Sequence, residues 1–82
     1  MTDDIKKFLR KLTKKQLEYV LPYMDKIERN DLAGLDCKPL RGHRGFFRVR
    51  AGSYRIVFYV MAAGENRILN VGKRDDQTYR DF

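Results

Sequence analysis

The sequence predicts an α+β domain, in which an N-terminal helical hairpin packs on a small three-stranded antiparallel β-sheet. Two observations predict it. Apolar residues recur at helical spacing over roughly the first 28 positions, and apolar residues alternate at strand spacing beyond residue 45. Because the helices precede the strands, the sheet is expected to be antiparallel and covered on one face. At 82 residues, the chain is long enough for one core only, so residues 1–82 are expected to form a single domain.

The first helix is predicted from the apolar positions Ile5, Phe8, Leu9 and Leu12, with Thr2 as its N-cap. The pattern restarts after Thr13, whose spacing from Gln16 is that of a capping box at the start of a second helix. Pro22 falls inside this second helix, and it is expected to bend the helix or to end it early because it removes a backbone donor.

Three strands are predicted, "FFRVR" and "YRIVFYV" around the turn "AGS", and then "RILNVG". The glycine-containing segment 29–45 between helices and strands reads as a loop. Strand alternation assigns to the core Phe47, Val49, Ile56, Phe58, Val60, Leu69 and Val71. The same alternation puts Arg48, Arg50 and Arg55 together on the opposite face, which is expected to be open to solvent.

The formal net charge of +7 indicates an anionic partner. Residues 41–55 are rich in arginine and contain no acidic residue, so the positive charge is concentrated on the predicted hairpin. Guanidinium groups clustered beside aromatic side chains suit phosphates and stacked bases, as in single-stranded RNA. The alternative is that each arginine pairs with an acid on an ordinary solvated surface.

Several classes of protein are disfavoured by the sequence. The single cysteine, Cys37, cannot form an internal disulfide, has no companion at metal-ligand spacing, and is expected to be a small, partly buried apolar residue. No apolar run approaches the roughly 18 residues of a membrane span. The N-terminus is charged where a signal peptide would be apolar. We therefore expect a cytoplasmic protein without a metal or another cofactor.

The segments "LRGHRGFFRVRAGSYRIVFYV" and "ILNVGKRDDQTYRDF" resemble the RelE/ParE superfamily of toxins from toxin–antitoxin modules. The shared features are a basic strand, a glycine turn, a Tyr-Arg-hydrophobic strand, and a last strand that ends in Gly-basic-Arg with a tyrosine soon after. The match runs from Leu40 to Phe82, about half of the chain. A helical hairpin before these strands is also expected of that superfamily.

This resemblance implies a toxin that cuts messenger RNA in the ribosomal A site without a metal ion and that is held inactive by an antitoxin. The resemblance implies catalytic roles for Arg48, Arg50, Arg55, Arg74 and Tyr79. The basic residues expected to bind RNA around them are Arg41, His43, Arg44 and Lys73. Arg55 and Arg74 would hold the scissile phosphate, and Tyr79 would stack on or orient a base.

Two features depart from the family pattern. Arg48 and Arg50 stand where RelE-type enzymes often carry lysines, and arginine cannot act as a general base in practice. His43, Tyr79 or the ribosome would then have to move the proton. The chain also lacks a strand before the first helix, so the predicted sheet has an open edge to which an antitoxin strand or a second copy could pair. A ParE-like gyrase inhibitor and a non-catalytic RNA-binding module remain alternatives.

Overall fold

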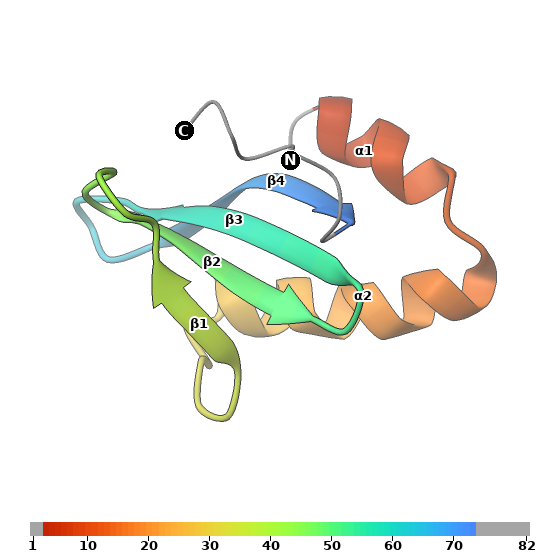
Figure 1. The fold of residues 1–82 in the computed structure, drawn as a ribbon, viewed down its shortest axis with the longest axis horizontal. Helices are drawn as coiled ribbons and strands as arrows, with labels where there is room; N and C mark the ends of the chain where they lie inside the picture. The colour runs from red at the N-terminus through yellow and green to blue at the C-terminus, as the bar shows by residue number, and fades with distance from the viewer. Residues whose placement is uncertain (1–2, 74–82) are drawn as a thin grey trace.

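The computed structural model describes residues 3–73 and has the predicted α+β architecture, with two helices and an antiparallel sheet (Figure 1). The elements are α1 (Asp3–Arg10), α2 (Lys14–Glu28), β1 (Asp36–Pro39), β2 (Phe46–Ala51), β3 (Tyr54–Val60) and β4 (Asn66–Lys73). The sheet has four strands in the order β1-β2-β3-β4, and every neighbouring pair is antiparallel. The predicted N-cap Thr2 lies outside the described residues, as do Arg74 and Tyr79.

The prediction of three strands was wrong, because the segment assigned to a loop contains β1. Cys37 pairs with Val49 and Lys38 pairs with Arg48, so the chain itself occupies the edge of β2 that was expected to be open. β1 is only four residues long, is mostly exposed and contains Lys38 and Pro39. Such a strand has no apolar alternation of its own, and its conformation depends on pairing with β2.

Helix α2 begins at the predicted capping box. The Thr13 hydroxyl accepts from the Gln16 backbone N–H at 3.2 Å, and the Gln16 side chain accepts from the Thr13 N–H at 2.8 Å. Pro22 does not end the helix, which continues to Glu28. Because Pro22 is exposed, the carbonyl that loses its helical donor can bind water instead.

The C-terminus of α2 is closed by a Schellman motif. Asn30 has a left-handed φ of 58°, and the Asp31 N–H donates to the Lys26 carbonyl at 2.8 Å. The first residue of β4 reinforces this end, since the buried Asn66 amide donates to the Ile27 carbonyl at 2.9 Å and to Asn30 Oδ1 at 3.1 Å. These bonds attach the end of the helix to the sheet.

Both helices pack on one face of the sheet, α1 beside β4 and α2 across β3 and β4, and they contact the sheet more than each other (Figure 1). The core consists of Ile5, Val20, Met24, Ile27, Val49, Tyr54, Ile56, Phe58, Ile68 and Val71. No helix in residues 3–73 has the length and apolar character needed to cross a bilayer.

Two predicted core positions were wrong. A register shift between Val57 and Phe58 pairs Phe58 with Ile68, while Val57 still pairs with Asn70. Leu69 is the extra residue of this bulge, so Ile68 takes the core position that strict alternation assigned to Leu69. Val60, at the end of β3, is 36% exposed and is not a core residue.

Candidate functional site

A cationic groove of about 760 Å³ opens beside the turn that joins β2 to β3. Its lining consists of Gln16, Arg50, Gly52, Ser53, Tyr54, Arg55 and Lys73. Three of these side chains are cationic, and none of the lining residues within 3–73 is acidic. A lining of this kind favours an anion, and the hydroxyl and amide groups add neutral hydrogen-bonding partners.

Strand pairing brings the three cations together. Arg50 and Arg55 lie directly opposite each other across the β2–β3 hairpin, and Lys73 pairs with Tyr54, the neighbour of Arg55. The residue opposite Arg55 on β4 is Gly72, which has no side chain to occupy the space beside the guanidinium. Like charges in directly opposed positions destabilise a sheet, so the arrangement favours binding of an anion that offsets their repulsion.

The arginine face is less open than predicted. Arg55 is 7% exposed, and the Nε atom of Arg50 is buried without a hydrogen-bond partner among residues 3–73. Val57, on the same face, is only 2% exposed and lies directly opposite Arg48. Aliphatic stems of arginines can cover apolar surface while their charged ends reach polar atoms, and Arg48 lies where its stem can cover Val57.

Arg48 does not line the groove. Its guanidinium lies 3.5 Å from a carboxylate oxygen of Asp36 and 3.5 Å from the Asp36 carbonyl, and its side chain is 12% exposed. The pairing follows from β1, the strand that the sequence did not predict. The alternative, an arginine paired with an acid, therefore holds for Arg48. The acid is Asp36, which lies on β1, a strand that was not predicted.

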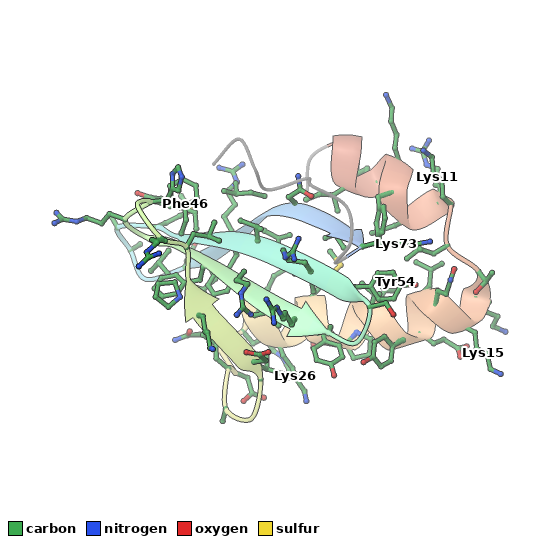
Figure 2. All side chains as sticks on the ribbon, viewed as in Figure 1. Lys11, Lys15, Lys26, Phe46, Tyr54 and Lys73 are labelled. Atoms are coloured by element: carbon green, nitrogen blue, oxygen red, sulfur yellow. The ribbon has the colours of Figure 1, made fainter. Side chains whose placement is uncertain are left out.

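The predicted RNA-binding residues Arg41, His43 and Arg44 lie in the loop before β2, away from the groove. Figure 2 shows Phe46 at one end of the sheet and Tyr54 and Lys73 at the other. Six strand residues at about 3.3 Å each separate the two ends by roughly 17 Å. The His43 ring is 6.2 Å from that of Phe46, so His43 is a neighbour of this aromatic end.

Sequence reasoning missed several groove residues. Gln16 was assigned to helix capping alone, and Gly52, Ser53 and Tyr54 were read only as turn and strand. No local pattern marks them as site residues. They reach the groove because the first turn of α2 packs beside the β2–β3 turn, a contact between segments far apart in the chain.

A second hollow, of about 340 Å³, lies beside the β3–β4 turn. Its lining includes Glu28 and Glu65 together with Arg67, so it carries charges of both signs and fits an anionic ligand less well than the groove does. Within residues 3–73, no group of three histidine, cysteine or acidic side chains could hold a metal ion.

Cys37 is a half-buried residue packed against the core, which confirms its predicted structural role. Burial raises the pKa of its thiol, while nearby Arg48 lowers it and Asp36 raises it. Because the balance favours the protonated thiol, Cys37 has the character of a packing residue and not that of a nucleophile.

Comparison with solved structures decides the fold. A RelB–RelE antitoxin–toxin complex from Methanococcus jannaschii contains a chain that superposes with a TM-score of 0.75 at 19% identity, covering 99% of this chain and 95% of that one. The chain has the RelE toxin fold. An archaeal RelE–RelB complex from Pyrococcus horikoshii OT3 gives a TM-score of 0.70 at 24% identity, with 90% of each chain covered. No family model and no curated protein matches the sequence.

At these identities, the RelE architecture is shared while most side chains differ. The cationic groove is therefore described from the residues of this chain, placed on a RelE-like sheet. Its Arg50, Arg55 and Lys73 were all predicted as site residues, and the structure brings them together.

Proposed function

We propose that this chain is the toxin of a type II toxin–antitoxin pair, a ribosome-dependent endoribonuclease that cleaves messenger RNA in the A site without a metal ion. The observation that carries the proposal is a groove on a RelE fold whose lining within residues 3–73 has three cations and no acid. A site of this charge suits the phosphodiester backbone of RNA.

The proposed reaction is attack of a ribose 2′-oxygen on the adjacent phosphorus. The bond to the 5′-oxygen of the next nucleotide breaks, leaving a cyclic phosphate and a 5′-hydroxyl end. Negative charge grows on the phosphorane, so preplaced cations stabilise the transition state more than the ground state. We assign this role to Arg50, Arg55 and Lys73, and also to Arg74, which lies outside the described residues.

The proton transfers need another group, because arginine retains its charge. Lys73 is the one lysine among the described residues that line the groove, and Tyr79, outside those residues, stays a second candidate. His43 is a weaker candidate as catalyst since it belongs to the opposite end of the sheet. Arg48, bound to Asp36, supports the sheet beside the groove, and we propose that it helps to position Arg50, two residues along β2.

We propose that Arg41, His43 and Arg44 bind RNA backbone at a distance from the groove. Arg41 and Arg44 are exposed on the loop before β2, so they can contact phosphates without rearrangement. This contact would orient the toxin on messenger or ribosomal RNA and would not take part in bond cleavage.

An antitoxin is the proposed protein partner. The two structural neighbours were solved as toxin–antitoxin complexes, and a partner with acidic residues would complement the cationic groove. The described sheet has two edges. Lys38 and Pro39 discourage addition of another strand at β1, so β4 is the edge left for the predicted strand pairing. We propose a partner that also covers the groove, whose Lys73 lies at the end of β4.

Induction of the chain in a bacterial host, followed by mapping of transcript 5′ ends, tests the proposal. Wild type should create new ends inside translated codons. Lys73→Gln should reduce cleavage by at least about 100-fold, the usual cost of losing one transition-state contact. Lys73 is exposed, so this change should leave folding intact. Arg55→Gln should reduce cleavage by a similar factor. Because Arg55 is buried, the unfolding midpoint of this variant must be measured as well.

Arg29→Gln is the matched control, because Arg29 forms an exposed ion pair with Asp25 on α2, away from the groove. This variant should cleave RNA like wild type. Growth arrest with intact transcripts would contradict the nuclease and support a ParE-like gyrase inhibitor. RNA binding without arrest or cleavage would support a non-catalytic RNA-binding module.

A further inference from the structure

An adjoining cavity, distinct from the hollow beside the β3–β4 turn, continues from the cationic groove onto α2. It has a volume of about 430 Å³ and is lined by Lys15, Gln16, Tyr19, Gly52, Ser53 and Tyr54. Gln16 and the turn residues Gly52, Ser53 and Tyr54 also line the groove, so the two hollows form one surface. Among the described residues, neither lining contains an acidic one.

Tyr19 is the exposed aromatic residue of this adjoining cavity. Its side chain is 43% exposed, yet its ring is supported by Tyr23 at 5.4 Å and by Tyr54 at 6.3 Å between centroids. A hydrogen bond with Tyr23 raises the pKa of Tyr19, and partial loss of water adds to the shift. The phenol therefore stays neutral at physiological pH and does not repel a nearby phosphate.

The β2–β3 turn holds the Tyr19 ring in place. Gly52 has a left-handed φ of 59°, and a Cβ atom built on it would lie 2.7 Å from the Tyr19 hydroxyl and 3.1 Å from its ring. The β2–β3 turn, which lines the groove, thus packs directly on the ring of Tyr19. Only glycine allows this close approach.

We propose that Tyr19 is a stacking platform for a nucleobase of RNA whose neighbouring phosphate lies in the cationic groove. A supported aromatic ring with an exposed surface suits any base, since every base has a π-face. Lys15 at the edge of the cavity suits the phosphate on the far side of that base. This inference rests on the proposed RNA substrate and extends its site from one phosphate to an adjoining nucleotide.

The test uses a 2′-O-methylated RNA trinucleotide, which cannot be cleaved, and versions of it with one base removed at each position in turn. Tyr19→Leu should weaken binding of the intact trinucleotide roughly 5- to 150-fold, whereas Tyr19→Phe should bind within about threefold of wild type. Removing the stacked base should weaken wild type by a similar factor and should not weaken Tyr19→Leu further.

Two further variants complete the design. Tyr59→Leu removes an exposed tyrosine from the opposite end of the sheet and should bind the trinucleotide like wild type. Gly52→Ala keeps the Tyr19 side chain but displaces its ring, and should also weaken base binding. If Tyr19→Leu fails to fold by circular dichroism, Gly52→Ala decides the question.

Each contrary outcome has a distinct meaning. If Lys73→Gln weakens RNA binding and the Tyr19 and Gly52 variants do not, the stacking platform is wrong and the proposed function stands. If wild type does not bind the trinucleotide at low salt, the stacking platform is wrong, whereas the proposed ribosome-dependent cleavage is decided separately by the transcript 5′ ends. If Tyr19→Leu weakens binding of an acidic peptide and leaves RNA binding unchanged, the cavity is a protein-docking surface and the stacking platform is overturned.

Discussion

Arg55 and Asn66 are the two buried polar or charged residues of the part of the chain described, 7% and 8% exposed. They serve different purposes. The Asn66 amide donates hydrogen bonds to the Ile27 carbonyl and to Asn30 Oδ1 at the end of α2, so its burial stabilises the fold. Arg55 lines the groove directly opposite Arg50, where we propose that it contributes to anion binding.

Asn66→Asp should destabilise the protein by about 1–3 kcal/mol at pH 7, because it replaces an amide donor with a carboxylate facing two oxygen acceptors. Those acceptors should raise the folded-state pKa of the new carboxyl above its unfolded value of about 3.9. The part of the loss that comes from ionisation is therefore absent below the unfolded pKa and complete above the folded pKa, while the single O–H donor of the protonated carboxyl replaces only one of the two lost bonds. Urea unfolding of mutant and wild type at pH 7 and near pH 4 measures the difference in their free energies of unfolding.

Asn66→Ala is the companion variant. It removes the same donors without adding an ionisable group, so its loss of stability should not change between the two pH values. An Asn66→Asp penalty that is equal at both pH values would contradict the proposed cause.

At the scale of the elements, the start of α2 has a structural and a functional role. Gln16 closes the capping box with Thr13, and the same residue lines both the groove and the adjoining cavity. The cap thus positions the first turn of α2 against the β2–β3 turn. Loss of the cap should disturb the site as well as the helix.

Thr13→Ala should lower the free energy of unfolding by about 1 kcal/mol, because the Gln16 N–H loses its acceptor. The urea midpoint should fall without a change in the slope of the transition. Thr13→Ser keeps the hydroxyl and should remain close to wild type. A stability loss in the serine variant as large as in the alanine variant would indicate that packing by the threonine methyl group, and not the cap, stabilises the helix.

At the scale of the whole molecule, positive charge is divided between two ends of the sheet. The groove holds Arg50, Arg55 and Lys73, and Figure 2 shows Lys73 at one end of the sheet. The loop with Arg41 and Arg44 directly precedes β2, whose first residue, Phe46, lies at the other end (Figure 2). A short RNA can reach only one of them, whereas a longer strand can contact both. Such a surface should bind RNA in a salt-dependent way.

Binding of the trinucleotide to the groove should weaken with salt, with a slope of about −1.4 for log K against log salt if both of its internucleotide phosphates are bound. Arg50→Gln should reduce the magnitude of that slope by about 0.7. Lys26→Gln, on the last turn of α2, is the control and should leave the slope unchanged. Titrations at several salt concentrations measure it, and an unchanged slope for Arg50→Gln would exclude this residue from the phosphate contacts.

The sequence by itself determined the elements whose signals are local. Apolar spacing and the capping box predicted the two helices, and alternation around a glycine turn predicted the hairpin that aligns Arg50 with Arg55. Only the tertiary structure decided the rest. β1 forms because β2 offers it an edge, the bulge at Leu69 interrupts alternation, and Arg48 takes Asp36 as its partner. Tyr19 meets Gly52 only when α2 packs beside the hairpin. These features depend on contacts between distant segments, which periodicity along one segment cannot encode.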